Sequence, residues 1–391
     1  MKICFYCDSI FSVGGVQKVI VAITSVLSEK NEITILSMDD SSVMDMNMYD
    51  LQKSRVSVSF FKFSEINRWD YLTHAPYSGA YKKFLPHNRF TSYLYSLSSF
   101  PQKRRKQLIE TLNEGNYDVI IGVHAFLSLK LATIRKHLNA RKVIGWMHNS
   151  YQAFFENNPA YLENLKSHFK FQMRKLDGIV VLTKTDAELY KKNLGLNPTV
   201  IYNPVTIKAQ RRCDTNAKTF LSVGRMSYRH KGFDILIKAF ALFCKENKEW
   251  KLNIVGEGPE KENLEELIQS FHLENRISIY PFTNEIEKYY STASVYVLSS
   301  RWEGFPLVLM EALSFGLPII SSDIPISKEV LEKKDFCFFF KNEDAESLCN
   351  EMKRMACADL AELSDGAHSF SQQSCHIDEI IKQWNAIFDE A

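Results

Sequence analysis

Residues 294–322, SVYVLSSRWEGFPLVLMEALSFGLPIISS, decide the fold. The run SVYVLSS is typical of a buried strand, LVLMEALSF of a helix and LPIISS of a second strand. Pro306 stands just before the helical pattern, where its fixed φ and missing N–H suit the start of a helix. A strand, a helix and a strand in this order predict two parallel strands joined by a crossover helix, the unit of an α/β fold.

The same alternation continues on the N-terminal side of this stretch. Further strands are predicted at 219–224, 251–256 and 276–280, and helices at 231–247 and 259–273. The helix at 231–247 repeats apolar residues at helical spacing, so one of its faces belongs to a core. From about residue 218 the chain therefore forms a self-contained, doubly wound unit of roughly 150 residues.

An earlier series of strands precedes this unit. These strands are predicted at 2–7, 32–37, 118–123, 142–146, 178–182 and 199–202. The segment 40–115 is less regular, and its elements cannot be assigned from the pattern. The boundary between the two series is expected near Asn203-Pro204, where a strand ends and a polar stretch follows. The final run, CHIDEIIKQWNAIF, predicts one more amphipathic helix.

Composition excludes several classes of protein. The 391 residues are 45% hydrophobic and 24% charged, as in a soluble globular protein and unlike a disordered, collagenous or coiled-coil chain. We expect no membrane-spanning helix, and no signal peptide because the first apolar run is short and carries Asp8. Lys and Arg number 48 against 46 Asp and Glu, so charge gives no reason to expect nucleic acid. Eight scattered cysteines favour a reduced, cytosolic chain without a metal site.

Ligands of doubly wound sheets bind beyond the carboxyl ends of the strands, so the residues that follow each strand are the candidates. Gly14 and Gly15 follow the first strand, where a glycine turn before a helix suits a phosphate or simply a tight turn. Arg225 and Lys231 flank the start of the helix after the strand at 219–224. Positive side chains at the N-terminus of a helix are unfavourable, because that end of the helix dipole is itself positive. A role in binding a diphosphate is therefore favoured over a role in stability.

In two more turns the backbone itself could bind a phosphate or another anion. Gly256 and Gly258 follow the strand at 251–256 and lead into a helix, which makes that turn a weaker candidate phosphate loop. The N–H groups near Gly304 and Phe305 precede the helix in the quoted stretch. We expect them to face the ligand edge of the sheet, where they suit an anion.

Three more side chains carry candidate chemistry. Glu303 lies in the loop before the helix at 307–315, and Glu311 lies inside that otherwise apolar helix. A carboxylate in such surroundings needs partners, either sugar or ribose hydroxyls or, alternatively, backbone groups or a basic side chain. His148 ends the strand at 142–146, where it is either a cleft residue or an ordinary satisfied polar group.

Positive charge is concentrated between residues 71 and 155, a segment that contains twelve Lys and Arg residues and only three acidic ones. Aromatic residues interleave with the cations at 81–106. This mixture suits an anionic membrane surface or a phosphorylated acceptor, although a solvated helix face with core aromatics is the plain alternative. The candidate membrane or acceptor residues are Lys82, Lys83, Arg89, Lys103, Arg104, Arg105 and Lys106.

Together these motifs resemble the family 4 retaining glycosyltransferases, also called glycosyl transferases group 1. The two glutamates of that family lie eight positions apart, as Glu303 and Glu311 do. The resemblance implies the α/β GT-B fold, in which two Rossmann-like doubly wound domains face each other across a cleft. It implies an acceptor-binding domain at 1–203, joined by a C-terminal helix at about 374–391, and a nucleotide-sugar-binding domain at 204–373.

The resemblance also assigns roles to residues. Glu303 would contact hydroxyls of the donor sugar and His148 would lie near that sugar, and we take both as candidate catalytic residues. Glu311 would bind the ribose diol, and Arg225 and Lys231 the diphosphate. With the turn glycines included, the expected donor-binding set is Gly14, Gly15, Arg225, Lys231, Gly256, Gly258, Gly304, Phe305, Pro306, Leu307 and Glu311.

The implied reaction moves a hexose from a nucleotide-diphosphate sugar, commonly UDP-linked, to a hydroxyl of a lipid-linked or surface glycan, with the anomeric configuration kept. Fixed cations and helix N-termini stabilise a leaving diphosphate without a metal, and the sequence has no Asp-x-Asp triplet, so no cofactor is expected. The expected location is the cytoplasm, with the basic segment as a candidate contact to the inner face of the membrane. Bacterial surface polysaccharide assembly, such as that of lipopolysaccharide, is the expected setting.

Other functions fit the same architecture. A nucleotide-sugar epimerase or phosphorylase is one alternative, and donor consumption without an acceptor would favour the epimerase. A catalytically silent nucleotide-binding scaffold is another, which the intact cations and both glutamates disfavour. A dinucleotide oxidoreductase is disfavoured because no G-x-G-x-x-G follows the first strand.

Overall fold

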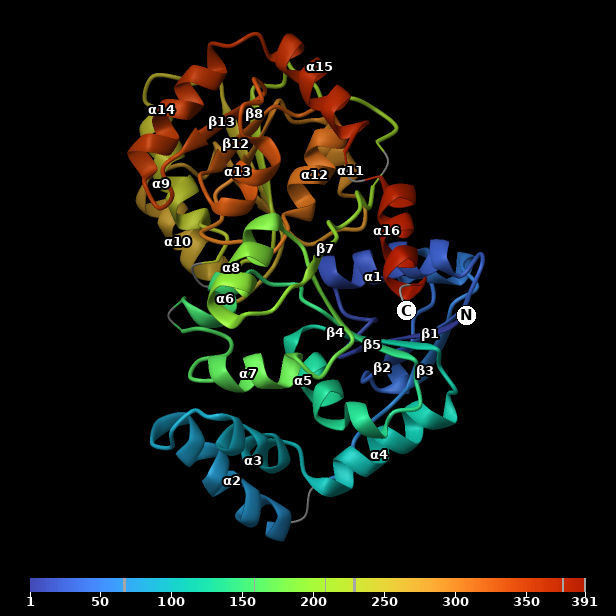
Figure 1. Ribbon diagram of the computed structural model, residues 1–391. Coiled ribbons are helices and arrows are strands. Elements are labelled where there is room, and N and C mark those ends of the chain that lie inside the picture. Colours follow the sequence, from blue (N-terminus) through green and yellow to red (C-terminus); the bar gives the residue numbers. More distant parts are fainter. Residues whose placement is uncertain (66–67, 158, 208, 228–229, 375, 390–391) are drawn as a thin grey trace. The chain divides into compact units, whose positions relative to one another are not determined.

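The computed structural model describes residues 1–65, 68–157, 159–207, 209–227, 230–374 and 376–389. The chain divides into two compact units. Unit 1 consists of Met1–Pro204 together with Ile377–Ala391, and unit 2 of Val205–His376. Each unit has its own parallel sheet, blue to green for unit 1 and yellow to red for unit 2 (Figure 1).

The sheet of unit 1 has seven strands, all paired in parallel, in the order β3-β2-β1-β4-β5-β6-β7. They are β1 (Lys2–Cys7), β2 (Glu32–Ser37), β3 (Ser57–Phe60), β4 (Val119–Val123), β5 (Lys142–Trp146), β6 (Gly178–Val181) and β7 (Thr199–Val200). The strand order reverses between β1 and β4, and this reversal is where doubly wound sheets bind ligands. Sequence analysis missed β3, a four-residue edge strand whose side chains are only half-buried or exposed, and predicted β7 two residues too long.

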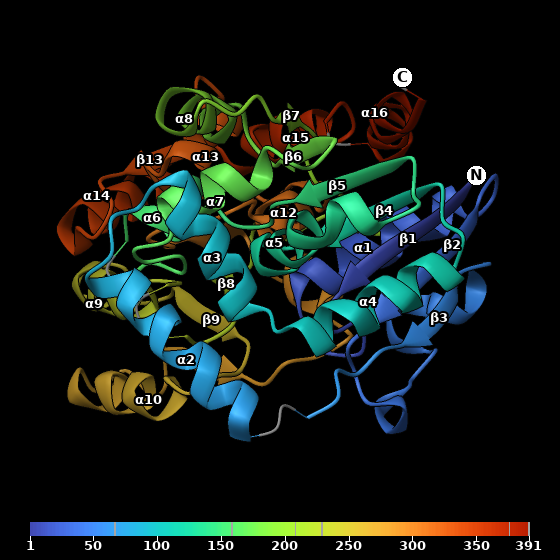
Figure 2. The same cartoon turned by 60° about the horizontal axis from the view of Figure 1, so that its bottom comes forward.

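Helices and short 3₁₀ turns surround this sheet. They are α1 (Gly15–Leu27), η1 (Ser41–Val43), η2 (Met48–Lys53), α2 (Arg68–Lys83), α3 (Arg89–Ser99), α4 (Gln102–Glu114), α5 (Ala125–Ile134), η3 (Arg135–His137), α6 (Tyr151–Phe155), α7 (Lys166–Met173), α8 (Lys184–Leu194) and α16 (Ile377–Asp389). The irregular segment 40–115 therefore holds three helices that the pattern did not indicate. Figure 2 shows α2 and α3 side by side, and α3 also contacts α7.

The last helix, α16, belongs to unit 1. The ammonium of Lys142, a nearly buried residue on β5, donates to the carbonyl of Ile387 at 2.6 Å. Arg141 donates to the carbonyl of Phe388 in the same way. Cations that meet the last carbonyls of a helix satisfy otherwise unpaired acceptors and complement the helix dipole. The buried Trp384 packs edge-on against Trp146 with ring centroids 5.0 Å apart, which fixes α16 to the sheet.

Unit 2 has a six-stranded parallel sheet in the order β10-β9-β8-β11-β12-β13. Its strands are β8 (Thr219–Val223), β9 (Lys251–Val255), β10 (Ile277–Tyr280), β11 (Val295–Leu298), β12 (Ile319–Ser322) and β13 (Cys337–Phe340). Its helices are α9 (Phe233–Phe243), α10 (Lys261–Ser270), α11 (Glu287–Ser291), α12 (Leu307–Ser314), α13 (Pro325–Leu331), α14 (Ala345–Ala356) and α15 (Leu360–Ser371).

The stretch quoted from the sequence forms β11, α12 and β12, with Tyr296 of β11 opposite Ile319 of β12. Sequence analysis missed β13, since a run of four apolar residues cannot be told from a buried helix turn by its period. The apolar face predicted for α9 is buried and packs in one core cluster with side chains of β8, β9 and α14. This core holds the loops that follow β8 and β11 in place.

Candidate active site

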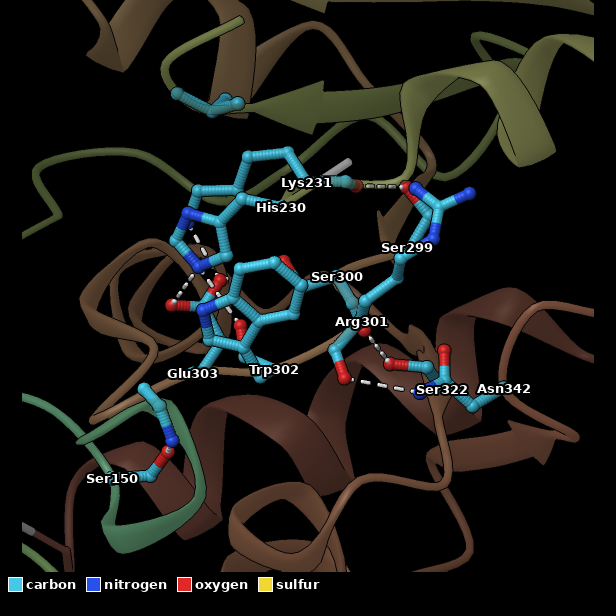
Figure 3. A network of polar contacts seen from close by, with 12 residues as sticks. Ser150, His230, Lys231, Ser299, Ser300, Arg301, Trp302, Glu303, Ser322 and Asn342 are labelled. Carbon is cyan, nitrogen blue, oxygen red and sulfur yellow. Dashed lines mark hydrogen bonds and ion pairs between the residues drawn. The ribbon is translucent and has the colours of Figure 1, made fainter. Parts of the chain in front are cut away.

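The loop between β11 and α12 carries a buried ion pair. The Lys231 Nζ lies 2.6 Å from the Glu303 Oε1, and the Ser300 hydroxyl donates to the same oxygen at 2.6 Å (Figure 3). The two charged side chains are 14% and 7% exposed. The Ser299 hydroxyl donates to the Lys231 carbonyl at 2.8 Å, which ties the segment before α9 to the loop after β11. Two loops from neighbouring strands thus hold the lysine and the carboxylate together.

His230 completes this cluster. Its ring stacks on Trp302 with centroids 5.0 Å apart, and its Nε2 lies 2.9 Å from the Trp302 carbonyl oxygen and 3.7 Å from the Glu303 Oε2. Burial lowers the pKa of His230, and the opposing effect of Glu303 does not reverse this shift. The imidazole is therefore neutral at neutral pH, and its Nε2–H donates to the Trp302 carbonyl. Sequence analysis did not predict His230, because a histidine in a loop belongs to no periodic pattern.

The charge state of Glu303 follows from its neighbours. Burial by itself raises the pKa of its carboxyl. Lys231, His230 and the Ser300 hydroxyl lower this pKa by more than burial raises it, so the net shift is downward. Glu303 is therefore ionised at neutral pH and its charge is balanced by Lys231. The family resemblance assigned Lys231 to the donor diphosphate and Glu303 to the donor sugar. In this structure the two side chains form an ion pair with each other.

Glycines shape the backbone beside this pair. A Cβ added to Gly224 would lie 3.0 Å from the Lys231 Cε, so the glycine leaves room for the lysine stem. A Cβ at Gly256 would lie 2.0 Å from the Gly224 carbonyl oxygen, and one at Gly258 would lie 2.2 Å from the Met226 carbonyl oxygen. Both turn glycines also have φ near +150°, which side-chain-bearing residues avoid. Close backbone approach explains these glycines, and a role for them in donor binding stays a prediction.

Arg225, the other predicted phosphate cation, lies on the loop after β8. Its side chain is exposed and, within the described parts of the chain, has no hydrogen-bond or ion-pair partner. Of the two cations expected to act together, the structure brings only Lys231 to Glu303. Arg225 is left with an uncommitted guanidinium at the edge where the strands of unit 2 end.

Glu311 is the second buried carboxylate, 2% exposed on α12. The Thr206 hydroxyl donates to its Oε1 at 2.9 Å and the Tyr290 hydroxyl to its Oε2 at 2.9 Å. These hydroxyls are the partners that a carboxylate in an apolar helix requires, and no local pattern indicated which residues would supply them. A carboxylate has about four lone-pair sites, so this arrangement is compatible with further donors.

The backbone between the two glutamates has the expected form. Gly304, Phe305, Pro306 and Leu307 are all buried, and α12 begins at Leu307 directly after Pro306. The N-terminus of α12 therefore lies four residues after Glu303. Its N–H groups are a source of partial positive charge beside the ion pair.

In unit 1, Gly14 and Gly15 lie at the N-terminus of α1, as the sequence predicted. The Gly14 N–H donates to the Tyr49 hydroxyl at 3.0 Å. This amide, which was expected to approach the donor, therefore already has a protein partner in this structure. A donor role for the two glycines stays a prediction.

His148 follows β5 and is 7% exposed. Its ring centroid lies 4.1 Å from that of Trp146, and its Nε2 has no hydrogen-bond partner within the described residues. Burial, and after it His124, lower the pKa of His148 well below its ordinary value. A neutral imidazole with a free ring nitrogen is thus held at the carboxyl end of β5.

His124 lies at the equivalent place after β4, next in the sheet. Its backbone adopts φ 82°, a left-handed conformation that is uncommon for residues other than glycine, and Asn149 donates to its Nε2 at 3.1 Å. The sequence analysis did not single out His124. His148 was chosen because it is a histidine at the carboxyl end of a strand. The same criterion applied to β4 would have identified His124.

The seven predicted membrane or acceptor cations separate into two groups. On α4, Arg105 donates to the Leu97 carbonyl at 3.3 Å, Arg104 lies over the Phe63 ring and Lys106 lies 3.6 Å from Glu110, which leaves Lys103 exposed. At the end of α2 and the start of α3 the other cations are exposed. These are Lys82, Lys83 and Arg89.

The described residues hold neither a metal cluster nor a membrane-spanning helix. Within those residues, no three His, Cys, Asp or Glu side chains are grouped as a metal site. Among the described helices, none has the length and apolar character needed to cross a membrane. The absence of a cofactor stays a prediction.

Comparison with protein families matches both units. The model for Glycosyl transferases group 1 matches residues 205–359, and that for Glycosyltransferase Family 4 matches residues 13–208. An uncharacterized glycosyltransferase of Haemophilus influenzae is 30% identical over 298 residues, which cover 75% of this chain and 82% of that protein. The O-antigen biosynthesis glycosyltransferase WclY of Escherichia coli is 34% identical over 114 residues, 29% of this chain and 31% of WclY.

Solved structures agree on the fold. Anabaena HepE in complex with UDP has a TM-score of 0.72 at 16% identity and covers 99% of both chains. The lipopolysaccharide outer core galactosyltransferase WaaB has a TM-score of 0.68 at 19% identity, also over 99% of both chains. The protein is therefore a glycosyltransferase of the GT-B fold. It belongs to glycosyltransferase family 4, the glycosyl transferases group 1, as the motif around Glu303 and Glu311 predicted.

Proposed function

We propose that this enzyme transfers a hexose from a UDP-sugar to a hydroxyl of a lipid-linked or surface-glycan acceptor, with the anomeric configuration retained. The observation that carries the proposal is the pair of buried carboxylates, Glu303 and Glu311, that flank the N-terminus of α12, with Lys231 on the first of them. Together they offer a cation for phosphate and carboxylates for hydroxyls at the ligand edge of a doubly wound sheet.

Lys231 is the residue that meets the donor diphosphate in this proposal. A leaving diphosphate carries more charge than the single carboxylate of Glu303, so it competes for the ammonium when it binds. Glu303 is then released to accept hydrogen bonds from the hexose hydroxyls. Arg225 adds a second, exposed cation for the same phosphates. Donor binding thus exchanges an internal ion pair for contacts to the substrate.

Glu311 is the residue that holds the ribose. Its carboxylate is fixed by Thr206 and Tyr290 and has the capacity to accept hydrogen bonds from a diol. Because the carboxylate is already buried and oriented, adding the diol requires little further desolvation. This fixes the nucleoside end of the donor relative to the diphosphate.

His148 is the proposed catalytic residue of unit 1. Transfer of a hexose passes through an oxocarbenium-like centre, which a neighbouring positive charge would destabilise. Burial keeps the imidazole of His148 neutral, so its unpartnered Nε2 offers a hydrogen bond to the sugar without that penalty. His148 acts in this proposal by orienting the sugar.

The choice of donor and acceptor is supported by similar proteins. HepE has been solved with UDP. WclY is an O-antigen biosynthesis glycosyltransferase and WaaB a lipopolysaccharide outer core galactosyltransferase, so both concern bacterial surface glycans. We infer the same setting for this enzyme, acting in the cytoplasm at the inner face of the membrane.

A panel of nucleotide sugars, scored by thermal unfolding, tests the donor. A donor held at 100 times its dissociation constant adds about 2.7 kcal/mol to the free energy of unfolding, so the right one stands out. Proton NMR of the first product then tests retention, because the anomer formed from an α-linked donor must be α. Consumption of the donor without acceptor, giving an isomeric nucleotide sugar, would identify an epimerase instead. Unchanged activity in EDTA is expected if no metal is required.

A further inference from the structure

The surface around α3 is cationic and lacks the acids that normally balance such charge. No Asp or Glu occurs between Asp70 and Glu110, while seven Lys and Arg do. The fold brings two more cations to this surface from distant parts of the sequence, Lys136 on η3 and Lys175 after α7. The local charge is therefore larger than the sequence segment alone suggests.

One of these cations, Lys175, lies close to an aromatic ring of α3. The Lys175 Nζ lies 5.9 Å from the ring centroid of Tyr93 on α3. Partial burial, and then the charges of Lys136 and Arg89, lower the pKa of Lys175, so both of these cations act electrostatically on Lys175. Gathering like charges in this way costs free energy, and an anionic partner removes that cost.

The protein itself supplies no such partner. Lys175 donates to the neutral side chain of Gln172 at 2.7 Å. The neighbouring carboxylate of Asp177 is already engaged by Arg135 at 2.6 Å. Within the described residues, Arg89, Lys136 and Lys175 form no ion pair with any carboxylate.

Large aromatic side chains stand beside these cations and point to a membrane. Phe84, Phe90 and Tyr93 are 84%, 68% and 47% exposed. A single exposed apolar residue is ordinary, but three large aromatics within ten residues of a cationic surface have the composition of a membrane-interface segment. A soluble phosphate compound would gain nothing from the two phenylalanines, which is why a lipid surface is the better partner.

This part of unit 1 is held rigidly enough to present those side chains. The Asn88 side chain caps α3 by accepting from the Thr91 N–H at 3.0 Å. The buried Tyr81 of α2 stacks on Tyr95 of α3 with ring centroids 4.7 Å apart, which locks the two helices together. In Figure 2 these helices lie at the near side of unit 1.

We propose that unit 1 binds an anionic lipid membrane through a cationic α3 surface, with phosphate headgroups at the cations and the phenylalanines inserted among the lipids. The surface consists of Lys82, Lys83, Phe84, Arg89, Phe90, Tyr93, Lys136 and Lys175. This deepens the proposed function, since it names the surface that brings the enzyme to a lipid-linked acceptor. The cations of α4 contribute less, because Arg104, Arg105 and Lys106 already have contacts within the protein.

Vesicle flotation tests this surface without requiring turnover. The protein is expected to bind vesicles of phosphatidylcholine with phosphatidylglycerol, to ignore phosphatidylcholine alone, and to bind less as salt rises. The triple variant R89E/K136E/K175E is expected to lose binding by on the order of 10²-fold. Its matched control, K30E/K192E/K248E, changes the same charge at exposed lysines elsewhere and is expected to bind like the wild type. The variant F84A/F90A is expected to weaken binding at least about tenfold, and to do so also at high salt.

Several outcomes would overturn the membrane surface. One is equal binding to neutral and anionic vesicles, and another is an equal loss in the control triple variant. Release of the protein by inorganic pyrophosphate, beyond the effect of sodium chloride at the same ionic strength, would show a soluble-anion site instead. If the charge reversal does not fold, R89Q/K136Q/K175Q takes its place. Thermal stabilisation by UDP is measured on every variant, so loss of vesicle binding with UDP binding intact separates this inference from the proposed function.

Discussion

The ammonium of Lys231 lies 2.6 Å from the carboxylate of Glu303, whose side chain is buried, while that of Lys231 is 14% exposed. Each residue on its own fits a contact to a nucleotide sugar, the lysine to phosphate and the glutamate to sugar hydroxyls. In this structure each neutralises the other. On the proposed function, a bound donor would exchange this ion pair for contacts of its own with the two side chains.

Replacing Glu303 by Gln separates the two roles. The substitution removes the competitor for Lys231, so the affinity for UDP is expected to stay the same or to rise. Turnover is expected to fall on the order of 10²-fold, because the carboxylate that orients the sugar is lost. Isothermal titration with UDP and initial rates with the UDP-sugar measure the two effects. A variant that binds UDP much more weakly would contradict the exchange.

Replacing Glu311 by Gln is expected to remove recognition of the ribose diol. The wild type should prefer UDP to 2′-deoxy-UDP by about tenfold, since a carboxylate hydrogen bond is worth about 1.5–3 kcal/mol. In the variant this preference should disappear. Titration of both nucleotides against both proteins gives the comparison. An undiminished preference for UDP would mean that Glu311 has only a structural role.

Replacing Tyr290 by Phe tests how Glu311 is held. The Tyr290 hydroxyl donates to the Glu311 Oε2 at 2.9 Å, so its loss leaves a buried carboxylate oxygen without that partner. The free energy of unfolding is expected to fall by about 1–3 kcal/mol. The urea unfolding midpoint checks this value, and replacing the exposed Tyr161, which lies outside this cluster, is a suitable control. Equal stability of Y290F and the wild type would contradict the assignment.

Trp384 of α16 is expected to position His148. The two are connected through Trp146, whose ring lies 5.0 Å from Trp384 and 4.1 Å from His148, centroid to centroid. Trp384→Ala should cost about 3–5 kcal/mol of stability, as for other buried aromatics. Trp384→Phe retains an aromatic ring at this position and so disturbs the packing less than alanine does. Because His148 would be less well positioned, this variant should lower kcat more than it raises KM. A variant that melts earlier yet has an unchanged kcat and pH profile would show that Trp384 acts on stability alone.

Acid is expected to destabilise unit 1. Burial lowers the pKa of His168 to about 4, whereas in the unfolded chain a histidine titrates near 6.5. Between these values the unfolded state binds more protons, so the free energy of unfolding falls as the pH falls. Urea midpoints measured from about pH 7 to about pH 5 should decrease, and His168→Gln should make the dependence less steep. A slope that the substitution leaves unchanged would contradict this origin.

Much of the fold was predictable from local sequence patterns. The strands that form the centre of each sheet are continuous apolar runs, and these were predicted within one or two residues. The strands that were missed, β3 and β13, lie at sheet edges and have four residues each, too few to show a period. Helices α2 and α4 were not predicted either. Pro76 interrupts the helical pattern of α2, and α4 begins with a run of cations and has only two buried apolar residues, Leu108 and Leu112.

The candidate site was predictable where a residue type stands at the end of a strand. His148 and Glu303 were singled out in this way, Lys231 from its place at a helix start and Glu311 as a carboxylate inside an apolar helix, and their roles in the site stay predictions. Their partners were not, because Thr206, Tyr290 and His230 approach from other loops and become neighbours only in the folded chain. In the same way, Lys175, directly after α7, comes beside Tyr93 of α3 only through the packing of α3 on α7.

The most direct test of the donor site is isothermal titration of UDP into the wild type and into the variant K231M/E311Q. The account predicts saturable binding by the wild type and an affinity lower by at least about 10²-fold in the variant, with circular dichroism unchanged. Equal UDP affinity in the two folded proteins would contradict it.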